Sequence, residues 1–273
     1  MSWIDPAYLR PRLLRRPEEG HKGDFGHLLV VAGCQTMPGA AVLATAAALR
    51  SGCGLVTLHS TPRALQAVVG RCPSAMLSED PGEAFSSLPG SMDKYSAIAV
   101  GPGLGREIKT KQALLALLEV AREWQVPVVI DADALNILSE LTSWADFVPP
   151  GAVLTPHLGE LRRLLSWDSE AERDRRVRAL CTAAGCTLVM KGYHTQVFTP
   201  DGSCLVNTTG NAGMAKGGSG DVLTGLLGGL LARGYAAPDA AALAVWLHGR
   251  AGRHIRELKE IYATSVFAMK TII

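Results

Sequence analysis

The chain has 273 residues, of which 48% are apolar and 19% are charged, and its formal net charge is +2. This composition can fill a sizeable core and excludes a disordered chain, and the near balance of charges gives no argument for nucleic acid or an anionic membrane as a partner. The six cysteines are scattered without a CxxC pair, which favours free thiols in a cytoplasmic protein over a disulfide framework or a zinc site.

The first 20 residues are predicted to be an N-terminal extension to a single domain formed by residues 21–273. They lack the continuous apolar run of a signal peptide, and the basic cluster at residues 10–16 is broken by proline, which indicates an exposed segment. No stretch of the sequence approaches the roughly 20 apolar residues needed to span a bilayer. We therefore expect a cytoplasmic protein with no membrane contact.

Short β-rich runs alternate with helical runs through the rest of the chain. Strands are predicted at residues 27–32, 55–59, 97–100, 126–130, 153–154 and 188–190, followed by a hairpin of residues 196–199 and 204–207. Helices are predicted at residues 39–50, 107–124 and 169–184, and two more follow Asp221 and Pro238. This alternation predicts a three-layer α/β/α fold with a mainly parallel central sheet.

Five of the predicted strands end in glycine or polar residues. These ends are Gly33, residues 101–105 (GPGLG), residues 131–133 (DAD), residues 155–157 (TPH) and residues 191–192 (KG). Ligands of parallel α/β sheets bind outside the carboxyl ends of the strands, so we expect the five ends to converge on one site.

The segment NTTGNAGMAKGGSGDVLTGLL, residues 207–227, is the most informative for function. Four glycines lie between Gly213 and Gly220, Asp221 follows, and an apolar helical run begins. Glycines and the free N–H groups of a helix start form an anion site, for which phosphate is the usual ligand. A carboxylate placed there suggests the activation of a hydroxyl that attacks the phosphate, although an ordinary helix-start aspartate is the alternative. The helix dipole is expected to favour ionised Asp221, which would make it a weak base.

Three other strand ends have both a functional and a structural interpretation. The GPGLG sequence and residues 191–195 (KGYHT) are either ligand contacts or ordinary loops. His157 is either a ligand contact or a structural residue, and Glu160 is expected in the first turn of the next helix, where the dipole favours it. Neither a Walker A motif nor a Rossmann fingerprint is present in the sequence.

Two further groups of residues also have both a functional and a structural interpretation. Asp131 and Asp133 either pair for metal or acid–base chemistry or cap the helix that follows them. Residues 36–41 open a helix rich in small side chains, which either lets a ligand approach the backbone or packs the helix tightly on the sheet.

Taken together, these segments resemble the ADP/ATP-dependent NAD(P)H-hydrate dehydratases, a family of the ribokinase-like superfamily. The motifs HKGDFGHLLVVAG, PGAA, VGPGLG, VIDADALN, LTPHLGE, VMKGYHT and NTTGNAGMAKGGSGD occur in the family's order over about residues 21–250. The resemblance implies a ribokinase-like fold and a repair reaction on the S-epimer of NADH or NADPH hydrate. ADP or ATP phosphorylates the hydroxyl on the reduced ring, and phosphate, a better leaving group than hydroxide, then departs.

The resemblance also implies a role for individual residues. Asp221 would be the catalytic base, and it would contact the substrate together with Ala41, Gly103 and His157. The nucleotide-binding residues would be Lys191, Gly192, Tyr193, His194, Thr195, Asn211, Lys216, Gly217, Gly218, Ser219 and Gly220. Mg²⁺ would bridge the phosphates of ADP or ATP, and no protein ligand to the metal is expected.

Partners and departures follow from the same resemblance. Many relatives carry an epimerase domain that this chain lacks, so a separate NAD(P)H-hydrate epimerase is the expected functional partner, and a homo-oligomer, a tetramer or larger, is expected. Ser219 replaces a common threonine and keeps its hydroxyl, whereas Arg253 stands where an acidic residue is common. Residues 256–273 match the family only loosely. This difference would affect contacts at the edge of the nucleotide or the packing of subunits, and not the chemistry.

Two other functions remain open at this point. A kinase of the same superfamily acting on a vitamin-precursor alcohol would use Asp221 in the same way but would release a stable phosphate ester. A non-catalytic nucleotide-binding protein would need no base. The preference for ADP or ATP, and for NADH or NADPH hydrate, also stays open.

Overall fold

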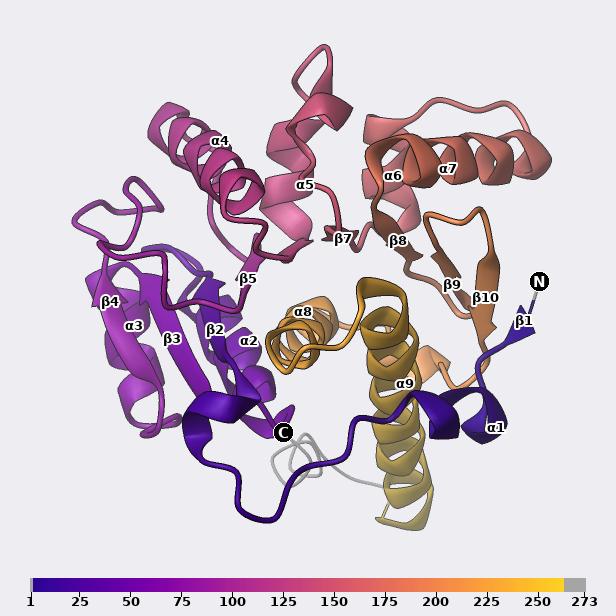
Figure 1. Cartoon of the computed structure of the whole chain (residues 1–273), viewed down its shortest axis with the longest axis horizontal. Helices are drawn as coiled ribbons and strands as arrows, with labels where there is room; N and C mark the ends of the chain where they lie inside the picture. Colours follow the sequence, from indigo (N-terminus) through magenta and orange to yellow (C-terminus); the bar gives the residue numbers. More distant parts are fainter. Residues whose placement is uncertain (1, 263–273) are drawn as a thin grey trace.

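The computed structural model describes residues 2–262, and their side chains as far as residue 253; this part of the chain forms a ten-stranded sheet between two layers of helices (Figure 1). The strands are β1 (Ser2–Trp3), β2 (His27–Val31), β3 (Leu55–Ser60), β4 (Met76–Glu79), β5 (Ala97–Val100), β6 (Val128–Ile130), β7 (Val153–Leu154), β8 (Thr187–Met190), β9 (Thr195–Phe198) and β10 (Cys204–Asn207). The helices are α1 (Pro6–Leu9), α2 (Pro38–Arg50), α3 (Pro62–Val69), α4 (Ile108–Glu123), α5 (Ala132–Leu138), α6 (Leu158–Leu164), α7 (Glu170–Ala184), α8 (Ser219–Ala232) and α9 (Ala237–Tyr262).

The sheet is mainly parallel, as predicted. Its order is β1-β10-β9-β8-β7-β6-β5-β2-β3-β4. All neighbouring strands from β8 to β4 along this order pair in parallel. The predicted hairpin is confirmed, because β9 pairs antiparallel with both β8 and β10. Val31 pairs with Val100, Val100 with Ile130, and Ile130 with Leu154, so the carboxyl ends of β2, β5, β6 and β7 are level.

Each face of the sheet has its own core because successive side chains of a strand point to opposite faces. In β2, Leu28 and Val30 belong to the core under α2, α3, α8 and α9. Leu29 and Val31 belong to the core under α4, α5, α6 and α7. Figure 1 shows these two helical layers on opposite sides of the sheet, which confirms the three-layer α/β/α architecture.

Helix boundaries follow local signals. Pro38 opens α2, and Ser169 caps α7 by accepting a hydrogen bond from the N–H of Glu172. Gly185 ends α7 in the left-handed conformation, with φ +62°. The predicted strands and long helices are confirmed to within a few residues. The short elements β1, α1, α3 and β4 were not predicted, and α5 and α6 were expected only as the helices that follow Asp133 and His157.

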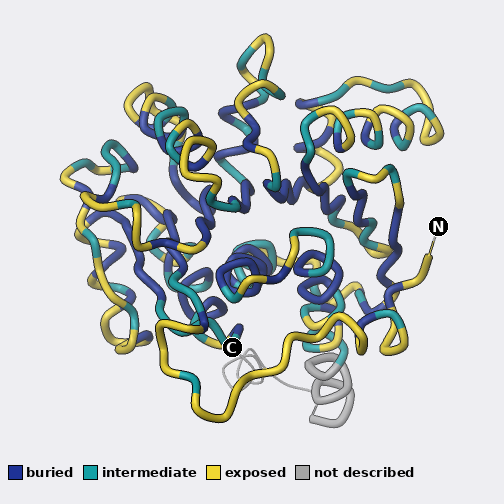
Figure 2. Tube along the Cα trace, in the orientation of Figure 1, coloured by how far each residue is buried: buried dark blue, intermediate teal, exposed yellow. Residues whose placement is uncertain are grey.

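The N-terminal residues join one end of the sheet through β1 and then pass along α9 and the end of α8. β1 pairs with β10, and Arg12 forms an ion pair with Asp239 of α9 at 3.1 Å. Residues 10–19 are exposed, as predicted for the basic cluster, and Figure 2 shows this arm as an exposed segment that runs below the helices of the lower layer. None of the helices within residues 2–262 combines the length and the apolar character that crossing a bilayer requires.

Candidate active site

The five predicted strand ends lie at one edge of the sheet. β2, β5, β6, β7 and β8 are adjacent and parallel, so the residues that follow them face a common space. The N–H of Gly33 donates to the carbonyl of Pro102 at 2.8 Å, which joins the loops after β2 and β5. His157 and Lys191 form a β-bridge that joins the loops after β7 and β8. The predicted convergence is therefore confirmed.

A buried ion pair lies at the centre of this edge. Lys191 Nζ is 2.7 Å from Asp131 Oδ1 and 3.7 Å from Glu160 Oε2, and Asp131 is only 1% exposed. Burial alone would lower the pKa of Lys191, but the charges of Asp131 and Glu160 outweigh it and leave that pKa raised. The site therefore holds a permanent cation where two strands end.

Asp131 does not act as the cap that its position suggests. It occupies the N-cap of α5, but its side chain accepts no capping hydrogen bond from that helix. Both of its oxygens are used elsewhere, by Lys191 and by Thr224 Oγ1, which donates to Oδ2 at 2.6 Å. Side-chain capping of α5 by Asp131 is therefore wrong, because a buried carboxylate is better stabilised by an ammonium and a hydroxyl than by a backbone N–H alone.

The glycine-rich segment turns into α8 next to the ion pair. Gly218 is the N-cap in the left-handed conformation, with φ +87°, and a Cβ there would lie 2.4 Å from Leu43 of α2. Helix α8 begins at Ser219, so Gly220 and Asp221 lie in its first turn, where backbone N–H groups have no partner within the helix. A Cβ on Gly220 would lie 3.4 Å from Lys191 Nζ, so the bare backbone of the turn faces the ammonium. A helix N-terminus and a lysine together suit an anion.

Asp221 is a stronger base than the helix dipole predicts. Burial raises its pKa, the nearby Asp131 raises it further, Lys191 lowers it, and Asp133 raises it. The net direction is upward from the ordinary value of 3.8, so the expected weak base is wrong. Desolvation and like charges outweigh the dipole because these carboxylates gather at one edge of the sheet. A carboxylate with a raised pKa suits proton abstraction.

Two of the predicted substrate residues lie together beside the start of α2. Gly103 has φ +63°, and a Cβ there would lie 2.8 Å from Ala40. Ala41 is fully buried, and its methyl group would lie 2.8 Å from a Cβ on Gly33. Tight packing of α2 on the strand ends therefore accounts for the small residues here. It also leaves the backbone of the loop after β5 close to α2.

His157 forms a capping box with Glu160. Its ring Nδ1 accepts hydrogen bonds from the backbone N–H groups of Gly159 and Glu160. The backbone N–H of His157 donates to Glu160 Oε2 at 2.8 Å. Glu160 lies in the first turn of α6, as predicted. The side chain of His157 is 52% exposed, so structural capping and contact with a ligand are compatible.

The predicted nucleotide-binding residues separate into two places. The turn of residues 192–195 lies against the glycine-rich segment, because a Cβ on Gly210 would be 2.8 Å from the carbonyl of Tyr193. Tyr193 is 66% exposed and its ring contacts that of His194. The side chain of Lys191, in contrast, turns away from them toward Gly220. The structure thus brings Lys191 to the start of α8 rather than to the exposed aromatic turn.

Three residues near the site were not assigned from the sequence. Thr224 stands in the apolar run that follows Asp221. His248 lies in α9, and its Nε2 is 3.3 Å from Ser219 Oγ. Burial and the charge of Lys191 lower the pKa of His248 to about 4, so the ring is neutral at physiological pH. Arg253, a departure from the family pattern, donates to the carbonyls of Thr208 and Thr209 at 2.5 and 3.2 Å. An acidic side chain could not make these bonds.

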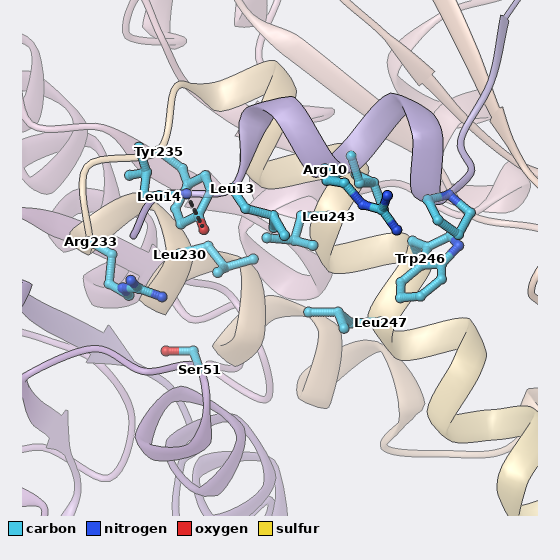
Figure 3. A pocket seen from close by; sticks show the side chains of 12 residues that line it. Arg10, Leu13, Leu14, Ser51, Leu230, Arg233, Tyr235, Leu243, Trp246 and Leu247 are labelled. Carbon is cyan, nitrogen blue, oxygen red and sulfur yellow. Dashed lines mark hydrogen bonds between the residues drawn. The ribbon is translucent and has the colours of Figure 1, made fainter. Parts of the chain in front are cut away.

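A separate groove lies at the opposite end of α8 from Asp221. It has a volume of about 430 Å³ and is bounded by the N-terminal arm, the end of α8 and the first turns of α9 (Figure 3). Most of its described lining is apolar, with Leu13, Leu230 and Leu243 close together and Arg10 and Arg233 at its rim (Figure 3). Its described lining contains no carboxylate, so it does not contribute to the chemistry above.

The sequence matches one family over most of its length. The family model described as NAD(P)H-hydrate dehydratase matches residues 28–273. The ADP-dependent (S)-NAD(P)H-hydrate dehydratase of Neisseria meningitidis serogroup B is 41% identical over 254 residues, which cover 91% of this chain and 83% of that protein. The bifunctional NAD(P)H-hydrate repair enzyme Nnr of Moorella thermoacetica is 39% identical over 264 residues, and the chain spans about half of its length (48%).

A solved structure agrees with the sequence match. The ADP/ATP-dependent NAD(P)H-hydrate dehydratase from Bacillus subtilis, co-crystallised with ATP and Mg²⁺, superposes with a TM-score of 0.79 at 32% identity, covering 92% of this chain and 88% of that one. Structural neighbours in the ribokinase-like superfamily identify the three-layer architecture as the ribokinase-like fold.

Proposed function

Because this chain belongs to the NAD(P)H-hydrate dehydratase family, we propose that it repairs hydrated nicotinamide cofactors. It dehydrates the S-epimer of NADH hydrate or NADPH hydrate and consumes ADP or ATP. The observation that carries this proposal is the carboxylate of Asp221 in the first turn of α8, with a raised pKa, beside the Lys191 ammonium. That arrangement provides a base and an anion site within one turn of helix.

The proposed reaction has two steps, a phosphoryl transfer and an elimination of phosphate. In the first, Asp221 accepts the proton of the ring hydroxyl while the hydroxyl oxygen bonds to the terminal phosphorus and the bond to the leaving nucleotide breaks, which gives AMP from ADP or ADP from ATP. In the second, the ring C–O bond breaks, phosphate leaves, and a proton departs from the neighbouring ring carbon to restore the double bond. Phosphoryl transfer depends mainly on position and charge stabilisation, which this edge of the sheet provides.

The phosphates would bind at the start of α8. The backbone N–H groups of Gly220 and Asp221, in the first turn of α8, and the Lys191 ammonium beside Gly220 would both stabilise negative charge that develops on the transferred group. Asn211, Lys216, Gly217 and Ser219 would extend this site along the loop. The turn of residues 192–195 would meet the adenosine, because it adjoins the same loop and exposes an aromatic ring.

The charge of the site fits a divalent cation. Asp131, Asp133, Glu160 and Asp221 gather around one lysine, so a nucleotide would enter a field with an excess of negative charge. Within the described residues no three His, Cys, Asp or Glu side chains are grouped so that they could hold a metal ion, and we propose that Mg²⁺ would be held mainly by phosphates and water. Asp131 and Glu160 pair with Lys191, and Asp133 accepts from the N–H of Gly105 at 3.0 Å, so no carboxylate of this group is assigned as a ligand to the ion. When bound, the ion would neutralise charge on the phosphates.

The substrate would occupy the space between α2, the loop after β5 and α6. We assign Ala41, Gly103 and His157 to this side of the edge, where the fully buried Ala41 lies in the first turn of α2, and Asp221 would face them from α8. The exposed ring of His157 is placed to contact the cofactor, whereas the bare backbone at Gly103 allows close approach.

The biological partners follow from the reaction. Several relatives are bifunctional NAD(P)H-hydrate repair enzymes, which supports a functional link to an NAD(P)H-hydrate epimerase activity that supplies the S-epimer. We place the enzyme in the cytoplasm and expect a homo-oligomer, a tetramer or larger. Recovery of near-ultraviolet absorbance from NADH hydrate, with ADP or ATP and Mg²⁺, tests the activity; no recovery with either nucleotide refutes it.

A further inference from the structure

Thr224 connects the phosphate-binding helix to the buried ion pair. It lies one turn after Gly220 and Asp221 in α8 and is fully buried. A threonine hydroxyl inside a helix commonly bonds to a carbonyl one turn back. Here Thr224 Oγ1 donates instead to Asp131 Oδ2 at 2.6 Å, across 93 positions of the sequence.

With this bond, both carboxylate oxygens of Asp131 accept a hydrogen bond. One carboxylate oxygen accepts from Lys191 and the other from Thr224, and both distances are those of charge-assisted hydrogen bonds. A buried carboxylate oxygen without a partner is costly, so the two bonds together fix the plane of the carboxylate. The carboxylate in turn fixes where the ammonium lies.

The ammonium has a second carboxylate within reach. Glu160 Oε2 is 3.7 Å from Lys191 Nζ, farther than Asp131 Oδ1 at 2.7 Å. If the Asp131 carboxylate turned, the Lys191 ammonium would move toward Glu160 and α6, away from Gly220. The hydroxyl of Thr224 opposes that movement because it holds the Asp131 oxygen nearer to α8.

We propose that Thr224 is a positioning residue for phosphoryl transfer: its hydroxyl orients Asp131 so that the Lys191 ammonium stays beside Gly220. The inference rests on the proposed function for its substrate, but not for its effect on nucleotide binding. Thr224 is fully buried and its hydroxyl bonds to Asp131, so it would act through Asp131 and Lys191.

The test compares Thr224→Val, which keeps the shape and removes the hydroxyl, with Thr224→Ser, which keeps the hydroxyl. Thr187→Val is the matched control, because Thr187 lies in β8, the strand that leads to Lys191, and its buried hydroxyl has no hydrogen-bond partner among the described residues. Each variant is assayed for kcat and KM with NADH hydrate, for ATP affinity by calorimetry with Mg²⁺, and for folding by thermal unfolding. Thr224→Ala is a second hydroxyl-free variant if valine fails to pack.

The expected result is a loss of about tenfold in kcat for Thr224→Val and an ATP dissociation constant raised about fivefold, with Thr224→Ser and Thr187→Val close to wild type. Unchanged kcat and ATP affinity in both hydroxyl-free variants would overturn the inference. So would equal losses in Thr224→Ser, since packing and not the hydroxyl would then be responsible. A wild-type protein that binds ATP but restores no NADH would refute the proposed function while leaving the calorimetric comparison decisive.

Discussion

Lys191 and Asp131, 60 positions apart in the sequence, form a buried ion pair of 2.7 Å immediately behind the bare backbone of Gly220. The pair joins the ends of β6 and β8 to the first turn of α8. It places one positive charge where a phosphate would meet the helix N-terminus, and it sets the electrostatic surroundings of Asp221. The predictions below test the parts of this arrangement separately.

Replacing Asp221 with asparagine should remove turnover and leave the fold intact. The amide cannot accept the hydroxyl proton, and loss of a general base commonly costs a factor of about 10²–10⁴. Ionised Asp221 is disfavoured in the folded protein, so the neutral amide should keep or increase the free energy of unfolding. Steady-state kinetics and thermal unfolding measure the two effects. Turnover near the wild-type rate would contradict the assignment of Asp221 as the base.

Replacing Gly220 with alanine should weaken nucleotide binding without destabilising the protein. The added methyl group would sit 3.4 Å from Lys191 Nζ and 3.7 Å from Asp131 Oδ2, which are ordinary contacts. It would, however, occupy the surface that a phosphate must approach, and we expect the dissociation constant for ATP to rise at least about tenfold. Calorimetry measures the affinity, and an unchanged value would count against the anion site.

Gly218→Ala is the contrasting variant in the same loop. Gly218 has φ +87°, and its added Cβ would lie 2.4 Å from Leu43, so alanine there is strained and crowded. We expect it to lower the free energy of unfolding by about 1–3 kcal/mol. Equal stability of the two alanine variants in chemical denaturation would show that the loop conformation is not fixed as described.

Replacing Lys191 with methionine should destabilise the protein more than replacing both members of the pair. The single change leaves Asp131 charged and buried without its ammonium, at a cost of about 3 kcal/mol. In the double variant Asp131→Asn/Lys191→Met residue 131 carries no charge, and although Glu160 still loses its contact with Lys191, part of that loss should be recovered. A double-mutant cycle from denaturant unfolding measures the coupling. Additive losses would indicate that the two side chains do not interact.

The neutral state of His248 predicts a loss of stability in acid. Its pKa falls from 6.5 to about 4 on folding, mainly through burial and then through Lys191. Between these values the unfolded chain binds a proton that the folded chain does not, so stability present above pH 6.5 is lost as the pH falls toward 4. We expect the loss to be on the order of 2 kcal/mol and to be absent in His248→Asn. Identical acid profiles for the two proteins would contradict it.

The sequence was sufficient to predict the strand ends and their convergence, because hydrophobic runs that stop at glycine or polar residues mark the edge of a parallel sheet. It could not predict which of these residues make contact. Asp131 was expected to cap the next helix or pair with Asp133, and it instead bonds to Lys191 and Thr224. The basicity of Asp221 was underestimated for the same reason, since its neighbours come from distant strands. The short elements α3, β4, α5 and α6 carry too few residues for a periodic signal.

The roles of Ala41, Gly103, His157 and the nucleotide-binding residues remain predictions, and residues 263–273 of the loosely matching tail lie outside the described part of the chain. Within that part, Arg253 has a structural explanation: it ties α9 to the loop that leads to Asn211. The departure from the family pattern therefore affects how the loop that begins at Thr208 is held.

The most direct test of the account is to incubate the protein with NADH hydrate, Mg²⁺ and either ADP or ATP, and to follow NADH absorbance and inorganic phosphate together. The account predicts that NADH and phosphate appear in equal amounts with at least one nucleotide, and that Asp221→Asn produces neither. A vitamin-precursor kinase would instead leave NADH hydrate unchanged and form a stable phosphate ester from its own alcohol. No recovery of NADH with either nucleotide would contradict the proposed dehydration.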